Sequence, residues 1–149
     1  MESLYPYFLT LHIFGAIMFV GTVFFEVFIL EGIRKDTSAR FMAAVEAAIG
    51  KRASRVMPFA LLMIYGGGIA MVIARYGFIV DAPFGSTFAT LLWIKILLAI
   101  SVFGHFCTAM IVRVSKNGMS SRFFKNLHLS VFTHMVFIVL IAKWMFYLS

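Results

Sequence analysis

Cysteine and charged residues are both scarce in this chain of 149 residues. Its single cysteine, Cys107, lies within an apolar run, so neither a disulfide framework nor a cluster of cysteine metal ligands can form within one chain. Only 13% of the residues are charged, whereas 62% are hydrophobic. An ordinary soluble domain has about a quarter of its residues charged. The composition therefore indicates a chain whose main solvent is lipid.

Acidic residues are the scarcer of the charged types, with 6 Asp and Glu against 13 Lys and Arg. In a soluble protein this excess would suggest a nucleic-acid partner. Here the basic residues cluster beside apolar runs, where they determine membrane topology. We therefore expect no nucleic-acid binding and expect the lipid bilayer to be the principal partner.

Four apolar runs are long enough to cross a bilayer, whose hydrocarbon core of about 30 Å needs about 20 helical residues. They cover residues 7–30, 57–74, 88–112 and 127–148. The first run is too long for a signal peptide and lacks a basic leader, so we expect it to remain as a helix. Neither an internal repeat nor a low-complexity tract is evident. The sequence predicts a single all-α transmembrane domain over residues 1–149, folded as an integral membrane four-helix bundle.

The segments between the spans differ in charge. Residues 31–55 are the most basic and carry apolar residues at helical spacing, which predicts an interfacial helix or an extension of the second span. Pro58 suits the first turn of that span, because a missing N–H costs nothing there. Residues 75–87 are rich in turn formers and are predicted to be a loop. The connection after residue 112 is basic again, so the positive-inside rule places both termini outside and the two basic segments in the cytoplasm. We expect the membrane to be the inner (cytoplasmic) membrane of a bacterium.

Polar residues in the spans recur every three or four residues, which aligns them on single helix faces. These faces should point into the bundle, because exposing them to lipid would cost several kcal/mol. The three stripes comprise His12, Gly15, Phe19, Thr22 and Glu26; Leu98, Ser101, His105 and Thr108; and Ser130, His134 and Phe137. A rise of about 1.5 Å per residue puts His12 and Lys95 about 10 Å below the outer surface. The same arithmetic puts His105 and His134 about 10 to 12 Å above the inner surface.

Two histidines at one depth predict a haem site. Neutral imidazole is a common axial ligand of haem b, and His105 with His134 would form one axial pair. His12 lies about 15 Å away along the membrane normal, so it would serve a second centre with Met71 or Lys95 as its partner. Packing of these side chains between helices is the alternative interpretation. The glycine triplet 66–68 has the same two interpretations, because glycines permit the close approach of either a neighbouring helix or a porphyrin.

Several of these residues resemble a known group of membrane proteins. The early histidine of the first span, the stretch from Phe41 to Pro58 with its basic turn, and Trp93-Ile94-Lys95 followed by His105 resemble HemJ-type protoporphyrinogen oxidases and CopD-type copper-resistance proteins. The resemblance implies a small helical membrane protein that binds haem b, with His12, Lys95 and His105 at the site. The Leu-Pro-Arg segment of the HemJ-like pattern is replaced by Phe25-Glu26-Val27-Phe28.

These observations lead to one main functional hypothesis and two alternatives. The main hypothesis is a membrane redox protein with one or two haem b groups, accepting electrons from a donor such as quinol and using Lys95 to bind a propionate or relay protons. Oxidation of protoporphyrinogen IX, with the porphyrin as substrate, is one alternative. Copper handling is the other, because thioether and imidazole together select Cu(I) and the chain has 10 Met. Small residues at Gly15, Gly21 and Ala74 permit a homo-oligomer.

Overall fold

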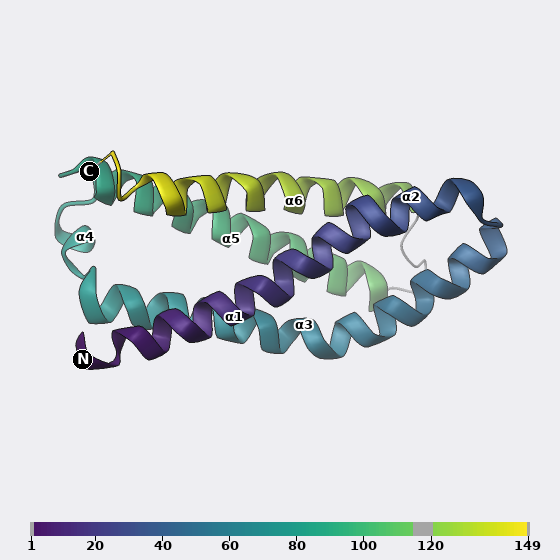
Figure 1. Ribbon diagram of the computed structural model, residues 1–149, viewed down its shortest axis with the longest axis horizontal. Helices are drawn as coiled ribbons and strands as arrows, with labels where there is room; N and C mark the ends of the chain where they lie inside the picture. Colours follow the sequence, from purple (N-terminus) through teal and green to yellow (C-terminus); the bar gives the residue numbers. More distant parts are fainter. Residues whose placement is uncertain (1, 115–120, 149) are drawn as a thin grey trace. The chain divides into compact units, whose positions relative to one another are not determined.

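The computed structural model describes residues 2–114 and 121–148, and helix is the only regular secondary structure in them. Four helical stretches are long and apolar enough to cross a membrane (Figure 1). They cover Glu2–Asp36, Ala39–Arg75, Thr87–Val112 and Arg122–Trp144. The predictions of an all-α chain and of four potential membrane spans are therefore confirmed.

The first stretch contains several helix types in series. A 3-10 turn, Glu2–Leu4, leads into α1, Tyr5–Phe24, which continues as a π-helix over Phe25–Leu30. The short α2, Glu31–Ile33, and a 3-10 turn, Arg34–Asp36, complete it. Helical hydrogen bonding thus runs past the predicted end at residue 30. The π-helix carries the buried carboxyl group of Glu26, which is 8% exposed.

The second stretch is the single helix α3, Ala39–Arg75, with 37 residues. Ser38 caps it, because its Oγ accepts a hydrogen bond from the N–H of Phe41 at 3.4 Å. Of the two predictions for residues 31–55, the extension of the second span is the one observed from Ala39 onward. The placement of Pro58 in a first turn was wrong, since it lies inside the helix. The capped segment before it forms its own helical hydrogen bonds, so the proline removes one bond without ending the helix.

The chain forms two compact units, Met1–Tyr76 and Gly77–Ser149, which we call the first and second unit. In the first unit α1 packs on α3 (Figure 1). Gly15, Phe19 and Val23 are buried on α1, and Ala60 and Gly67 are buried on α3. Small residues on both helices permit a close backbone approach.

The second unit contains α4, Phe78–Asp81, α5, Thr87–Val114, and α6, Ser121–Trp144. The prediction that residues 75–87 form a loop was wrong at α4, a single turn that the indole of Trp93 stabilises by donating to the Ile79 carbonyl at 3.0 Å. α5 and α6 run side by side in opposite directions (Figure 1). α6 ends at Trp144, four residues before the predicted end of the fourth span at residue 148. This antiparallel pair brings together the polar residues of the third and fourth spans.

Candidate functional site

A five-residue pattern occurs once on each of the two long helices of the second unit, α5 and α6. α5 carries Ser-Val-Phe-Gly-His over residues 101–105, and α6 carries Ser-Val-Phe-Thr-His over residues 130–134. The two valines, Val102 and Val131, are each 4% exposed, so both patterns turn the same face into the helix pair. The expectation of no internal repeat did not cover it, because a five-residue pattern in apolar sequence is shorter than the repeats that define a fold. The identical spacing of serine and histidine in the two copies is the signal from which the repeat could have been found.

The repeated serines and histidines form a crossed set of hydrogen bonds. The Nδ1 atom of His105 lies 2.8 Å from the Ser101 carbonyl oxygen, and its Nε2 lies 2.9 Å from the Ser130 hydroxyl. The Nδ1 atom of His134 lies 2.8 Å from the Ser130 carbonyl oxygen, and its Nε2 lies 3.1 Å from the Ser101 hydroxyl. Each histidine is thus held by its own helix through Nδ1 and meets the opposite helix through Nε2.

The tautomer of each ring in its neutral form follows from these partners. A carbonyl oxygen only accepts, so each Nδ1 carries a hydrogen and donates it. In a neutral imidazole the other nitrogen then has the lone pair, so Nε2 accepts from the serine hydroxyl. An Nδ1–H bond to a backbone carbonyl is also the usual support of a metal-ligating histidine. The network therefore presents two basic Nε2 atoms in the tautomer that metal coordination requires.

The spacing of the two rings limits what can bind between them. The ring centres of His105 and His134 are 5.3 Å apart, and the ring planes make an angle of 56°. Two coaxial metal–imidazole bonds of about 2 Å each already separate the nitrogen atoms by about 4 Å, and each ring centre lies further back. A porphyrin held between these histidines as a coaxial pair needs the ring centres further apart than 5.3 Å, so that pair stays a prediction. A single small ion with bent coordination requires less separation.

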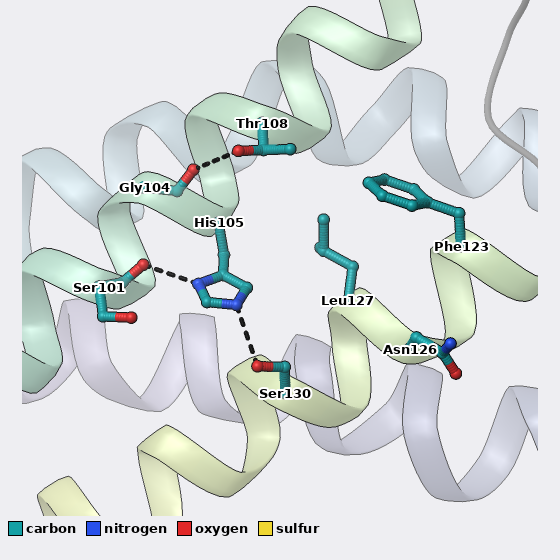
Figure 2. Close-up of a pocket in the computed structure, with 8 residues that line it drawn as sticks. All are labelled: Ser101, Gly104, His105, Thr108, Phe123, Asn126, Leu127 and Ser130. Carbon is teal, nitrogen blue, oxygen red and sulfur yellow. Dashed lines mark hydrogen bonds between the residues drawn. The ribbon is translucent and has the colours of Figure 1, made fainter.

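A groove of about 590 Å³ opens beside His105 (Figure 2). This volume is within the range of sites for small molecules and cofactors, about 300 to 1,000 Å³. Gly104 has no side chain to fill it, and Phe123 and Leu127 give it apolar walls. The lining residues are Ser101, Gly104, His105, Thr108, Phe123, Asn126, Leu127 and Ser130. The groove therefore combines the apolar side chains of Phe123 and Leu127 with His105, the serine that donates to it and three further polar residues.

His12 belongs to the first unit and has a different environment. Its Nδ1 donates to the Ile64 carbonyl of α3 at 2.7 Å, so its lone pair is on Nε2. A Cβ atom on Gly67 would lie 2.9 Å from the Phe8 carbonyl oxygen and 3.0 Å from the His12 Cβ, while one on Gly68 would lie 3.4 Å from the imidazole. Two members of the glycine triplet thus serve close packing of α3 on α1.

Lys95 lies on α5 in the second unit and is half-buried. His12 lies in the first unit, so the outer site predicted for this pair stays a prediction. Met71, the other suggested partner of His12, lies on α3 within the first unit and is also half-buried.

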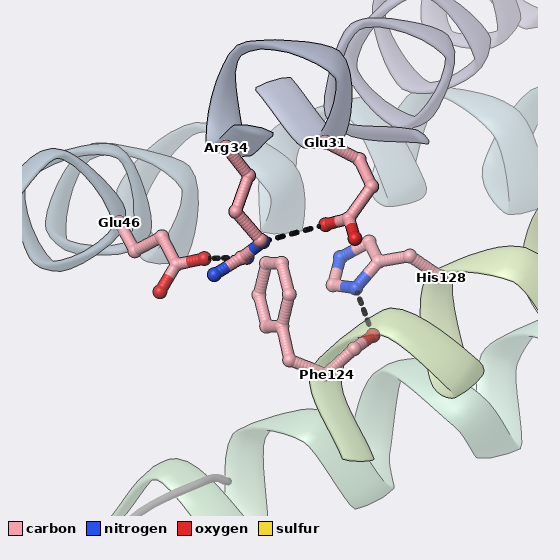
Figure 3. A network of polar contacts seen from close by, with 5 residues as sticks. All are labelled: Glu31, Arg34, Glu46, Phe124 and His128. Atoms are coloured by element: carbon pink, nitrogen blue, oxygen red, sulfur yellow. Dashed lines mark hydrogen bonds and ion pairs between the residues drawn. The ribbon is translucent and has the colours of Figure 1, made fainter. Parts of the chain in front are cut away.

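His128 and Arg34 form two further polar arrangements, one in each unit, and Figure 3 draws both. The Nδ1 of His128 donates to the Phe124 carbonyl at 2.8 Å, and the Phe124 ring centre lies 4.0 Å from the imidazole centre. In the first unit the guanidinium of Arg34 bonds to Glu31 at 2.8 Å and also to Glu46. This ion triad joins the end of the first helical stretch to α3.

Within residues 2–114 and 121–148, no group of three or more His, Cys, Asp or Glu side chains is arranged to hold a metal ion. Any metal site in this part of the chain therefore needs other donors, such as methionine sulfur, or the four nitrogen atoms that a porphyrin supplies.

Comparisons of this chain with protein-family models, with curated proteins and with solved structures found no match. The resemblance to HemJ-type and CopD-type proteins stays a prediction, and function has to be inferred from the residues and geometry of this chain.

Proposed function

We propose that the chain is an integral membrane protein that binds haem b and transfers electrons, with the groove beside His105 as the haem site. The four long apolar helices support the membrane location. The basic segments 31–55 and 113–125 support an orientation with both termini outside. Haem b supplies one-electron redox chemistry, and a membrane quinol is the proposed electron donor.

The observation that carries this proposal is the position of His105 at the groove. Its Nδ1 is fixed by the Ser101 carbonyl at 2.8 Å, so the basic Nε2 is the atom available for coordination. The same ring lines a groove of about 590 Å³ with apolar walls. A protein uses such a lining to exclude water from a flat apolar cofactor, while one imidazole holds the iron.

Ser130 and His134 have supporting roles in this proposal. Ser130 donates to the His105 Nε2 at 2.9 Å, so it holds the ring in place and must release it when Nε2 binds iron. The ring centre of His134 is 5.3 Å from that of His105, so we assign the haem to the groove and give His134 the role of linking α6 to α5 through Ser101. His12, in the first unit, remains a proposed ligand of a second haem at a separate outer site.

Copper handling is the second candidate function, because one observation favours it. The imidazole rings of His105 and His134 lie across α5 and α6 with their centres 5.3 Å apart, a spacing that suits one small ion better than a porphyrin between the rings. Met135, adjacent to His134, is buried in the same unit and could add a thioether ligand. Copper would therefore bind between the histidines, whereas haem would occupy the groove.

The absorption spectrum of the purified protein tests the main proposal. We expect a Soret band after expression with sufficient haem, and its loss in His105→Ala. His128→Ala is the matched control, because His128 makes the same Nδ1 bond to a backbone carbonyl on α6 without lining the groove. It should retain the Soret band.

Metal analysis of the same preparations separates the two functions. A wild-type protein with no Soret band and about one copper per chain would overturn haem binding in favour of copper. A Soret band that persists in His105→Ala and is lost in His128→Ala would place the haem elsewhere. A protein with neither haem nor copper would overturn both candidates.

A further inference from the structure

α3 has one face that is exposed along the whole of its apolar part. Phe59, Leu62, Ile69 and Ile73 are between 60% and 70% exposed. With the exposed Gly66, their spacing of three, four, three and four residues places them on one face. The buried residues of α3, among them Met57, Ala60 and Gly67, occupy the opposite face. This exposed face, which we call the α3 stripe, is the side of α3 that would meet lipid.

Three cations continue the α3 stripe at its amino-terminal end. Arg55 precedes Phe59 by four residues, and Lys51 and Arg52 precede Arg55 by four and three residues. All three side chains are exposed. No carboxylate lies within ion-pair distance of them in the part of the chain that the structure describes. The nearest carboxylate in sequence, Glu46, is bound to Arg34.

The length of the uncharged segment sets the depth of these cations. No charged residue occurs between Arg55 and Arg75 on α3. At about 1.5 Å per residue this segment is about 28 Å long, close to the hydrocarbon thickness of about 30 Å. Arg55 therefore lies where the hydrocarbon ends. Lys51 and Arg52 lie about one turn further out, at the level of lipid headgroups.

We infer that Lys51, Arg52 and Arg55 form a binding site for an anionic phospholipid, whose acyl chains lie on Phe59 and Leu62 along the α3 stripe. The inference rests on the proposed membrane insertion of α3. Two arginines and a lysine supply several N–H donors to one phosphate, and guanidinium groups bind phosphate in a bidentate way. Exposed cations with no protein carboxylate beside them complement the charge of such a headgroup. A zwitterionic lipid, which carries its own cation, complements them less well.

Competition between phosphatidylglycerol and phosphatidylcholine tests the site. The purified full chain in neutral detergent is mixed with equal amounts of the two lipids, and native mass spectrometry counts those retained. We expect wild type to retain phosphatidylglycerol preferentially. The variant Lys51→Gln/Arg52→Gln/Arg55→Gln should lose this preference. Each cation removed should lower the ratio of retained phosphatidylglycerol to phosphatidylcholine about fivefold, which is the effect of one basic residue near an anionic surface.

Lys35→Gln/Arg40→Gln is the matched control, because both residues are exposed cations of the same basic segment but lie further from the apolar part of α3. It should keep the preference. Equal retention of the two lipids by wild type would overturn the inference without need of a variant, and so would a loss of preference in the control equal to that in the triple variant. Loss of bound phosphatidylglycerol in excess inorganic phosphate would also overturn it, in favour of a site for free phosphate.

Carbonate extraction of membranes separates failure of this site from failure of the proposed function. A chain that stays in the membrane pellet but shows no lipid preference lacks only the lipid site. A chain released by carbonate is not inserted, which would overturn the membrane proposal as well.

Discussion

The two helix pairs of this chain are held together in different ways. α1 and α3 approach through glycines, so that a Cβ on Gly15 would lie 2.8 Å from the Ala60 carbonyl oxygen. α5 and α6 are joined by side chains, through the crossed bonds of two serines and two histidines. The first arrangement brings backbones together. The second keeps polar side chains between the helices and leaves a groove beside one of them.

This difference indicates which pair has room for a ligand. A contact built on glycine has no side-chain groups that could bind a ligand, and it does not tolerate added volume. A contact built on imidazole and hydroxyl groups tolerates exchange of partners, because a serine can release a nitrogen that then binds a metal. We therefore assign close packing to the α1–α3 contact and the groove haem to the α5–α6 pair, and the predictions below test that division.

The largest effect on stability is expected from Gly67→Ala. The added Cβ would meet the Phe8 carbonyl oxygen at 2.9 Å and His12 at 3.0 Å, so the α1–α3 contact must open. Overpacking of this kind costs about 1 to 3 kcal/mol. Denaturant unfolding in detergent, followed by circular dichroism, measures it.

Gly66→Ala is the control for this prediction, because a Cβ there has nothing within 4 Å. It should raise stability by about 0.5 to 1 kcal/mol, since alanine favours a helix interior over glycine. Equal effects at the two positions would show that α1 and α3 do not pack as described.

A smaller effect is expected from Ser101→Ala and Ser130→Ala. Each removes one of the two crossed bonds, and interhelical hydrogen bonds in membrane proteins contribute about 0.6 kcal/mol on average. The two losses should be similar, because the serines occupy equivalent positions in the repeat. Unfolding of both variants under the same conditions measures them, and a large difference between them would contradict the equivalence.

Substitution of the same two serines should affect haem affinity differently. Ser130 donates to the His105 Nε2, the proposed ligand atom, whereas Ser101 donates to His134. Ser130→Ala should therefore bind haem more tightly than wild type, because no hydroxyl competes for Nε2, and Ser101→Ala should not. Titration of haem into the apoprotein measures both affinities. A gain in Ser101→Ala alone would point to His134 as the ligand.

The last effect is confined to high pH and arises at the end of the first unit, where the Tyr76 hydroxyl lies 3.0 Å from that of Tyr5. Burial, and then the hydrogen bond to Tyr5, raise the pKa of Tyr76 from 10.0 to about 12. Above pH 10 the unfolded chain releases this proton before the folded one does, so stability should fall between pH 10.0 and about 12. Tyr5→Phe should narrow that range, and a spectrophotometric titration at 295 nm would show the lower pKa. An unchanged pKa would exclude the contribution of Tyr5.

The sequence predicted the helices better than their ends. Hydropathy located all four long helices, because 20 apolar residues are a strong signal for a membrane span. It did not predict the π-helix at residues 25–30 or the passage of α3 through Pro58, since both depend on hydrogen bonding that a hydropathy pattern does not contain. The turn α4 was missed for a similar reason, because it depends on a bond from Trp93.

Part of the candidate site was also visible in the sequence. The depth arithmetic placed His105 and His134 at one level, and the structure has their rings 5.3 Å apart. The depth arithmetic could not give the direction of the Nε2 atoms, because that direction depends on the serine of the opposite helix. The coaxial haem pair was inferred from depth alone, and depth does not report the distance between helices.

The haem content of His12→Ala and His105→Ala tests the division between the two units most directly. Each variant is purified beside wild type, and haem per chain is measured by the pyridine haemochrome method after size-exclusion chromatography has shown that the protein is folded. We predict that His105→Ala loses the groove haem and that His12→Ala retains it. Retention in His105→Ala together with loss in His12→Ala would contradict the account, because the ligand would then belong to the glycine-packed unit.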